Sequence, residues 1–399
     1  MSGFEARNKV AIVGYAQSPI TRHAPVPLGA LAVDTARAAI SDAGLTVADM
    51  DGFVTGSLFP TAGAHEITDG VSIVSANWLA QHLGSDPSYV AGFQGFGQIP
   101  GAVAMAVNAV ASGAADYVLM HRALHNPRGQ YHRNPMTSVS GPLQWTVPQG
   151  FFGPISMIAL TYNEYVQRYG ASREAMAAVL VEARRQGARI PWSFWHDRPL
   201  ASAEYLNAPL ISDPICRYDC DLPVDGVAAF ILTSVERAKD LPHRPVFVSG
   251  FAAGQPRTRR LPAHWPLEDI MEVGAALARR LWRASGVTVD EVDLPQVYDG
   301  FSPFVYFWLE CLGYCAVGEA HELALSGGLD ADEGGLPVLS GGGALGNGRM
   351  HGIPQMLECY LQLSGRAGPR QRRDATVGVA CHASPHLGGA VVYTSEPDR

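Results

Sequence analysis

Two stretches of the sequence, AISDAGLTVADMDGFVTGS (39–57) and LWRASGVTVDEVDLPQVYDGF (281–301), repeat one pattern. At a constant offset they share Gly44 with Gly286, Thr46 with Thr288, Val47 with Val289, and Asp51 with Asp293. Each glycine falls where a helix is expected to end, because glycine adopts the left-handed conformation of a helix C-cap without strain. The stretches indicate a duplicated unit, and a chance likeness between two helix ends is the alternative.

A strand and a helix precede each copy. VAIVG (10–14) and a helix over 28–43 lead into the first copy, and VFVSG (246–250) and a helix over 267–285 lead into the second. Each copy then runs into another strand. A repeated strand–helix–strand unit predicts an α/β fold in which two similar halves pack together.

The repeat also suggests domain boundaries. We expect residues 1–120 and 216–240 to form the N-terminal half and residues 241–399 to form the C-terminal half. Residues 121–215 interrupt the repeat and are expected to form an inserted loop region that acts as a lid or faces a dimer partner. This insertion is rich in large apolar side chains, including Trp145, Trp192 and Trp195.

The composition limits the class of protein. With 399 residues, of which 47% are hydrophobic and 17% charged, the chain fits a well-buried α/β protein. A net charge of −8 argues against nucleic acid as the main partner. The chain contains no apolar run long enough to span a membrane and begins without a hydrophobic signal core. Its six scattered cysteines fit reduced thiols, so we expect a cytoplasmic protein without a metal site.

A turn in the first half has the form of a reactive site. The stretch YVAGFQGFGQIPGAVAMAVNAV (89–110) reads as a strand, a glycine-rich turn and an alanine-rich helix. The N–H groups at a helix N-terminus stabilise negative charge, so such a turn suits an anionic group. Gln94 and Gly95 occupy this turn, which holds no cysteine, serine or acid. The sequence therefore predicts a site from which the nucleophile is missing.

These features, together with DCDLPVDGVAAFILTSVERA (219–238), resemble the thiolase superfamily over essentially the whole chain, in its sterol-carrier, lipid-transfer branch. The resemblance implies the thiolase fold, in which two duplicated α/β halves form a five-layer α-β-α-β-α core. Thiolases carry a nucleophilic cysteine where Gln94 or Gly95 stands here, and a Gly-His-Pro where Arg349 or His351 stands. Because acyl exchange needs a thiolate that attacks and later leaves, we do not expect ordinary thiolase chemistry.

The chain also resembles the steroid side-chain aldolases of this superfamily, which cleave β-hydroxyacyl-CoA thioesters without a covalent intermediate. That reaction needs a base for the hydroxyl proton, a group that holds the enolate, and a proton for carbon. QVYDGFSPFVYFWLECLGYC (296–315) carries the Tyr-Asp of these aldolases. The resemblance implies that Tyr298 is a base assisted by a cation, with Arg349 as the candidate, and that Asp299 orients it. A tyrosine packed at a strand end is the alternative.

Two further stretches are expected at the rim of the site. SGGGALGNGRMHG (340–352) is a glycine-rich loop in which the resemblance implies that His351 faces the thioester, with a purely structural loop as the alternative. Ile353 stands where the related aldolases carry an aromatic acid, which leaves the second proton-transfer group open. In CHASPHLGGAVV (381–392), Gly388 and Gly389 are expected to offer N–H groups to the substrate, and His386 is a weaker candidate.

The sequence thus predicts a lyase that cleaves a bulky, steroid-derived β-hydroxyacyl-CoA to a ketone and a shorter acyl-CoA, with no cofactor beyond the CoA of the substrate. A non-catalytic acyl-CoA or lipid-binding subunit and a cysteine-independent acyltransferase are the alternatives. A homodimer is expected, because symmetric dimers are the commonest oligomers, with the strand 115–120 and the helix 100–113 at its seam. The resemblance also implies a small OB-fold partner protein with a zinc ribbon.

Overall fold

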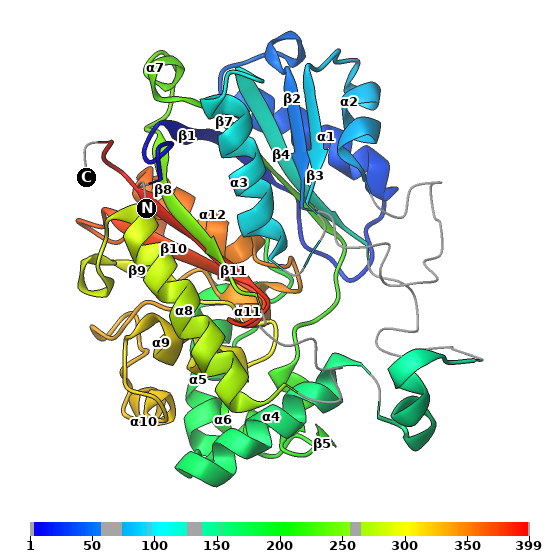
Figure 1. Cartoon of the computed structure of the whole chain (residues 1–399), viewed down its shortest axis with the longest axis vertical. Helices are drawn as coiled ribbons and strands as arrows, with labels where there is room; N and C mark the ends of the chain where they lie inside the picture. The colour runs from blue at the N-terminus through cyan, green and yellow to red at the C-terminus, as the bar shows by residue number, and fades with distance from the viewer. Residues whose placement is uncertain are drawn as a thin grey trace.

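The computed structural model describes residues 4–56, 74–93, 95, 97–125, 138–151, 153–255 and 265–397 (Figure 1). The N-terminal half begins with a strand and continues through alternating helices and strands: β1 (Val10–Gln17), α1 (Leu28–Asp42), β2 (Gly52–Thr55), α2 (Ala76–Leu83), β3 (Tyr89–Gly92), α3 (Gln98–Ala111), β4 (Tyr117–Leu124), and, after the insertion, β7 (Gly226–Ser234) and α7 (Val235–Ala238).

The C-terminal half repeats this order with extra helices. Its elements are β8 (Val246–Ala253), α8 (Leu267–Ser285), β9 (Leu294–Gln296), α9 (Pro303–Leu312), α10 (Ala320–Leu325), α11 (Gly343–Asn347), α12 (Ile353–Leu363), β10 (Val377–His382) and β11 (Gly389–Thr394). The insertion contributes α4 (Pro154–Tyr169), α5 (Arg173–Gly187), α6 (Ser202–Leu206), β5 (Leu210–Ser212) and β6 (Ile215–Cys216). Short 3-10 helices cover Val47–Asp49, Gly141–Trp145, Val147–Gln149, Arg217–Asp219, Val289–Glu291 and Gly368–Arg370.

The strand order confirms the predicted duplication. The nine strands of the large sheet follow the order β3-β2-β4-β7-β1-β8-β11-β10-β9, and β5 and β6 pair in a separate two-stranded sheet. Strand β4 pairs parallel with β2 and antiparallel with β7, and β10 pairs in the same way with β9 and β11. The two halves meet at a ladder between β1 and β8 that contains only two residue pairs, Ala11 with Phe247 and Ile12 with Val246. A pseudo-two-fold relation between the halves therefore passes through this short ladder.

The repeated aspartates show why the two sequence stretches agree. Asp51 accepts hydrogen bonds from the backbone N–H groups of Asp116 and Tyr117, where β4 begins. Asp293 does the same for Thr376 and Val377, where β10 begins. Each carboxylate thus fixes the start of the strand that lies beside its own, because it satisfies two backbone N–H groups there. The duplication is a shared set of contacts as well as a shared order of elements.

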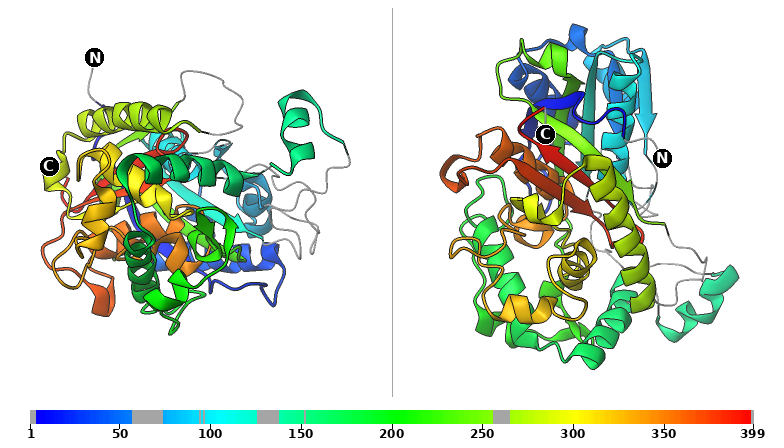
Figure 2. Two further views of the ribbon diagram at one scale, coloured as in Figure 1. Left: turned by 90° about the horizontal axis from the view of Figure 1, so that it is seen from below. Right: turned by 60° about the vertical axis from the view of Figure 1, so that its left-hand side comes forward.

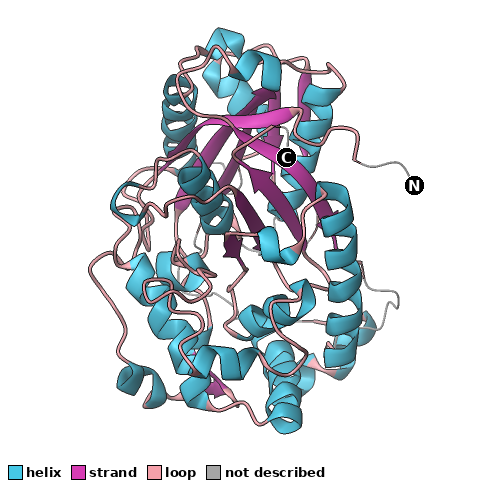
Figure 3. Cartoon of the chain, turned by 90° about the vertical axis from the view of Figure 1, so that its left-hand side faces the viewer, coloured by secondary structure: helices cyan, strands magenta, loops and turns pink. Residues whose placement is uncertain are grey.

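Helices lie on both faces of each half of the sheet (Figure 3). Helices α1 and α2 cover the outer face of the N-terminal half, and α8 covers the outer face of the C-terminal half. Helix α3 contacts β2, β4 and β7 of its own half and also β8, β10 and β11 of the other half, while α12 packs on β9, β10 and β11. Because α3 and α12 lie between the halves, the core has the predicted order of five layers, helix, sheet, helix, sheet and helix.

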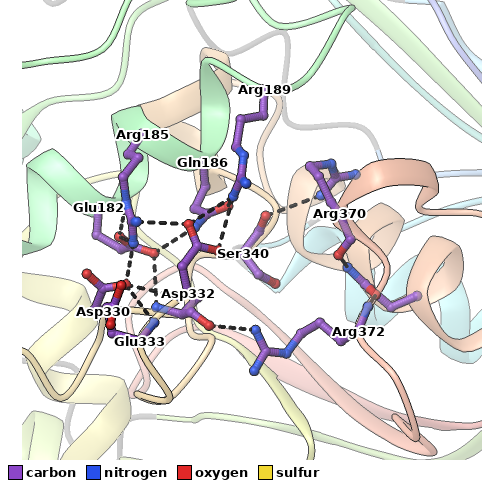
Figure 4. A network of polar contacts seen from close by, with 12 residues as sticks. Glu182, Arg185, Gln186, Arg189, Asp330, Asp332, Glu333, Ser340, Arg370 and Arg372 are labelled. Carbon is purple, nitrogen blue, oxygen red and sulfur yellow. Dashed lines mark hydrogen bonds and ion pairs between the residues drawn. The ribbon is translucent and has the colours of Figure 1, made fainter.

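The insertion packs mainly on the C-terminal half (Figures 1 and 2). Helix α5 contacts α10 and α11, and no side chain separates the backbones of Gly187 and Gly346, since a Cβ on Gly187 would lie 1.9 Å from the Gly346 carbonyl oxygen. Arg185 forms ion pairs with Glu182, Asp330 and Asp332 (Figure 4). These contacts hold α5 against the C-terminal half of the molecule.

The tryptophans of the insertion have separate surroundings. Trp195 lies beneath the Arg184 guanidinium at 3.6 Å, and Trp192 packs against the apolar cluster between the halves. Trp145 is 76% exposed, on a pair of 3-10 helices (141–149) that stands away from the body of the molecule (Figure 1). Two of the three tryptophans thus serve packing.

The strand order corrects the predicted dimer seam. Strand β4 runs from 117 to 124, past the predicted boundary at 120, and has neighbours on both sides. It therefore offers no free edge to a second subunit, and α3 lies between the two halves. Among the described strands of the N-terminal half, β3 is the one at the sheet edge. No described helix has both the length and the apolar content needed to cross a membrane.

Candidate active site

Asp299 holds the glycine-rich loop in place. Its Oδ1 accepts hydrogen bonds from Ala344 N (2.6 Å) and Gln355 Nε2 (2.9 Å), and its Oδ2 accepts one from Leu345 N (3.0 Å). A Cβ on Gly343 would lie 2.1 Å from Oδ2, so only glycine fits beside the carboxylate. Burial raises the pKa of Asp299 to about 6, against the effect of these hydrogen bonds. Asp299 is therefore the anchor of α11, and its lone pairs are already engaged.

Tyr298 is buried in the wall beside this anchor. Its ring makes an edge-to-face contact with His382, with centroids 5.0 Å apart, and stacks on Phe304. Burial raises its pKa well above the ordinary value, and the nearby carboxyls of Asp221 and Asp299 raise it further, while Arg122 acts in the opposite direction. Tyr298 is thus a neutral hydroxyl at neutral pH. The cation that bears on it is Arg122, whereas the sequence suggested Arg349.

His351 lies on the same wall. It has a left-handed backbone conformation (φ 46°) between α11 and α12, and its ring centroid is 6.1 Å from that of His382. A Cβ on Gly352 would lie 2.6 Å from His382 Cδ2, so the following glycine lets the two rings approach. Tyr298, His382 and His351 consequently form one continuous row of rings. Ile353 follows in the core and is 1% exposed, so it contributes no polar group.

Arg122 is a buried cation that the sequence analysis did not identify. It lies near the end of β4, where the side chains of Leu119 and Ala123 face the outer cluster with α1 and that of Met120 faces the cluster between the halves. Alternation along a strand places Arg122 on the same inner face as Met120. Arg122 is only 2% exposed, and its Nε has no hydrogen-bond partner within the described chain. Burial lowers its pKa to about 9.

Arg349 provides a second positive charge. Its side chain is a quarter exposed, and its Nε lies 3.9 Å from Asp221 Oδ1. Desolvation lowers the pKa of Arg349 to about 9, and repulsion by Arg122 contributes. Because the charges of the two guanidinium groups act on each other, an anion bound between them would relieve the repulsion. The sequence placed Arg349 in the site, and the structure adds Arg122 from the other half.

Asp221 completes this set of charges and was also missed. A bridge between Cys220 and Phe301 aligns the two segments, and Asp221 N donates to Gly300 O at 3.1 Å. The bridge brings Asp221 beside Tyr298 and Asp299. Burial raises the pKa of Asp221 well above its ordinary range, and the charge of Asp299 adds to this effect. The only signal in the sequence was the Asp-Cys-Asp order that starts the signature.

Asp219, two residues before Asp221, makes structural contacts. Asp219 Oδ1 accepts hydrogen bonds from Tyr205 Oη and Ser302 Oγ, and its Oδ2 accepts one from Cys216 N. These partners belong to the insertion and to the start of α9, so Asp219 joins the insertion to the wall of the site. Asp219 and Asp221 are only two residues apart, but Asp219 contacts the insertion and the start of α9 while Asp221 lies beside Tyr298.

The remaining predicted residues surround the turn before α3. Gln94 lies outside the described residues, and Gly95 is half-buried. A Cβ on Gly97 would lie 3.2 Å from the Gly388 carbonyl carbon, so the turn packs directly on Gly388 and Gly389. Gly388 N already donates to Ser384 O at 2.7 Å. The structure therefore makes Gly388 a residue of close packing, and its N–H is engaged rather than free for a substrate.

At neutral pH His386 is a neutral imidazole and the thiols carry no negative charge. Burial lowers the pKa of His386 to about 4, and its ring packs against Trp265 while Nδ1 bonds to Ser384 Oγ. Burial raises the pKa of all six cysteines, Cys216, Cys220, Cys311, Cys315, Cys359 and Cys381. At neutral pH these thiols are protonated, and a protonated thiol is a poor nucleophile.

Comparison with known proteins places this chain in a family. Residues 268–392 match the thiolase C-terminal domain-like family. The chain is 30% identical over 345 residues to a steroid side-chain-cleaving aldolase of Thermomonospora curvata, covering 84% of this chain and 85% of that protein. It is 28% identical over 367 residues to the 17-hydroxy-3-oxo-4-pregnene-20-carboxyl-CoA lyase of Mycobacterium tuberculosis, covering 90% of this chain and 92% of that protein.

The solved structures agree with the sequence comparison. The Ltp2-ChsH2(DUF35) aldolase has a chain that superposes with a TM-score of 0.85 at 27% identity, covering 98% of each chain. Sterol carrier protein 2 of Homo sapiens is a more distant relative, 27% identical over 247 residues. The chain belongs to the thiolase superfamily, in the branch that includes the sterol-carrier proteins and the steroid side-chain-cleaving aldolases.

Proposed function

We propose that this protein is an aldolase that cleaves a bulky, steroid-derived β-hydroxyacyl-CoA to a ketone and a shorter acyl-CoA. The observation that carries the proposal is a buried site in which Arg122 and Asp221 act on the neutral Tyr298 hydroxyl, and Arg349 lies 3.9 Å from the Asp221 carboxyl. None of the thiols is ionised at neutral pH. The names of the relatives from Thermomonospora curvata and Mycobacterium tuberculosis describe a reaction of this class. The reaction as proposed uses no cofactor beyond the CoA of the substrate.

The charges of the site suit the electronic course of a retro-aldol cleavage. When the Cα–Cβ bond breaks, its electron pair passes to the thioester and forms an enolate. Arg122 and Arg349 provide a positive wall for that charge, which acts strongly because the surroundings are apolar and preorganised. Tyr298, as a neutral hydroxyl, donates a hydrogen bond to the same developing anion, and the ring of His351 lies on the same wall.

Cleavage of a defined substrate tests the proposal. We expect the purified protein to convert 17-hydroxy-3-oxo-4-pregnene-20-carboxyl-CoA, the compound in the name of the mycobacterial relative, into a C17 ketone and a shorter acyl-CoA, measured by mass spectrometry. The matched control is the analogue that lacks the β-hydroxyl, which has no proton to lose and should stay intact. Tight binding of both compounds with cleavage of neither would instead support the acyl-CoA-binding alternative.

We further propose that the protein is a homodimer that joins through the edge strand β3 and works with a small partner protein. An unpaired edge is a ready surface for a second strand, and β3 is such an edge among the described strands. The name of the Ltp2-ChsH2(DUF35) aldolase describes a two-protein assembly, and the resemblance implies an OB-fold partner. Light scattering at several concentrations tests the dimer, and a monomer that is fully active alone would refute both proposals.

A further inference from the structure

We propose that Asp221 is the general base of this site, the group that takes the proton from the β-hydroxyl of the substrate. This inference rests on the aldolase function proposed above. It assigns the base to a residue of the signature segment before β7, whereas the sequence suggested Tyr298.

Two carboxyls lie beside Tyr298, and only one of them is available to accept a proton from a substrate. Asp299 accepts three hydrogen bonds from Ala344, Leu345 and Gln355, so its oxygens are engaged. No described residue donates a hydrogen bond to the Asp221 carboxyl, whose one ion pair is the long contact of 3.9 Å with Arg349 Nε. The Asp221 side chain is nevertheless only 5% exposed. A buried carboxyl without hydrogen bonds is costly for the fold, which is expected where a ligand supplies the missing donor.

The position of Asp221 is set by backbone contacts on both sides. The Cys220–Phe301 bridge, the bond from Asp221 N to Gly300 O and the bond from Ser302 N to Asp219 O hold the two segments in register. This register is independent of the Asp221 side chain. A base held by its backbone keeps its place when its side chain changes protonation state, which suits repeated proton transfer.

Burial, and after it the charge of Asp299, make Asp221 a stronger base than an ordinary carboxylate. Asp299 and Tyr298 face it from the segment after β9, Arg349 from the loop before α12, and Cys220 from its own segment, while Arg122 of β4 bears on Tyr298 and Arg349. Burial raises the pKa of Asp221, and a base whose pKa lies closer to the working pH takes a proton more effectively. Because only the carboxylate can accept the proton, turnover should rise as the pH rises through this pKa.

The proposed step balances. The carboxylate of Asp221 takes the hydroxyl proton, the O–H electron pair forms the C=O bond of the ketone, and the Cα–Cβ pair becomes the enolate of the shorter thioester. A proton then reaches Cα, and Asp221 releases its own proton to restore the carboxylate. The overall reaction gains and loses no proton and needs no oxidant, reductant or further reactant.

Asp221→Asn tests the assignment, with Asp225→Asn as the matched control. Both are buried aspartates of one segment, but Asp225 accepts a hydrogen bond from Ala24 N at 2.7 Å. We expect D221N to lose about 10²–10⁴-fold in turnover while its melting temperature stays equal to or above that of the wild type, since an uncompensated carboxyl is removed. We expect D225N to melt at a lower temperature and to keep its turnover per folded molecule.

A second measurement separates the base from the group that protonates carbon. The wild type should exchange the α-proton of the shorter acyl-CoA with deuterium from D₂O, and D221N should retain that exchange while cleavage is lost. D221N that cleaves at the wild-type rate, that loses both reactions, or that melts well below the wild type would overturn the assignment. A wild-type protein that cleaves no β-hydroxyacyl-CoA would instead contradict the proposed function, so the two failures are distinguishable.

Discussion

Replacing Arg122 by methionine should make the protein more stable and less active. Burial lowers the pKa of Arg122 to about 9, from an ordinary value above 12. At about 1.4 kcal/mol for each pH unit, retaining this charge in the folded protein costs about 5 kcal/mol. Methionine is unbranched like the apolar stem of arginine, but it is shorter. The packing that is lost therefore cancels part of the gain in stability. We expect a net increase of about 1–3 kcal/mol in the free energy of unfolding.

The expected shift can be measured by calorimetry. An unfolding entropy of about 2.1 cal/mol/K per residue gives about 0.8 kcal/mol/K for a chain of this length, so the melting temperature should rise by about 1–4 °C. Turnover should fall about 10²–10³-fold, the typical effect of losing one donor to a developing oxyanion. Arg122→Lys keeps the charge and should restore part of the turnover without the gain in stability.

Arg370→Met is the matched control. Arg370 is also buried, but its guanidinium lies 2.5 Å from Glu358 Oε2 and donates to Ser340 O. Its removal strands a buried carboxylate and should cost about 3–5 kcal/mol, so the melting temperature should fall. If Arg122→Met lowers the melting temperature as Arg370→Met does, Arg122 has a structural partner and the reasoning about an unpaired cation is refuted.

Three further predictions concern the wall of the site. Tyr298→Phe should fold normally and lose about 10²–10³-fold in turnover, since a hydrogen-bond donor disappears with little change in volume; wild-type turnover would contradict the assignment. Asp299→Asn should lower the free energy of unfolding by about 1–3 kcal/mol in a denaturant titration, because it disturbs the three bonds that anchor α11. Iodoacetamide at neutral pH should leave turnover intact, because all six thiols have raised pKa values; inactivation prevented by substrate would contradict this.

The sequence predicted the architecture well because local contacts repeat in both halves. Gly44 and Gly286 both adopt left-handed conformations after their helices, with φ of 75° and 71°. The predicted helix over 267–285 matches α8, and the strands predicted at 10–14 and 246–250 begin where β1 and β8 begin. These features depend on residues close in sequence, so pattern and propensity were sufficient to find them.

The site was harder to predict because it depends on contacts between distant segments. Asp221 reaches Tyr298 only through the bridge between Cys220 and Phe301, and no local pattern announces that pairing. Arg122 lies near the end of β4, which places its side chain between the halves. The run Gly341–Gly343 suggested a flexible loop around a substrate, yet Gly343 makes room for the Asp299 carboxylate. The predicted dimer seam was wrong for the same reason, since strand order is a property of the whole sheet.

The place of β7 in the sheet has a consequence for how the chain is made. Strand β7 lies between β4 and β1, yet the ribosome completes it only after the whole insertion has left the exit tunnel. Until then β1 and β4 of the nascent chain lack their shared neighbour and have open edges. Helix α5 also lacks its packing partners α10 and α11, which are synthesised later still. Open strand edges promote association between incomplete chains. Rapid synthesis at high concentration should therefore favour aggregation of nascent chains, and slower translation through the insertion should not relieve it, because the missing strand lies beyond that segment.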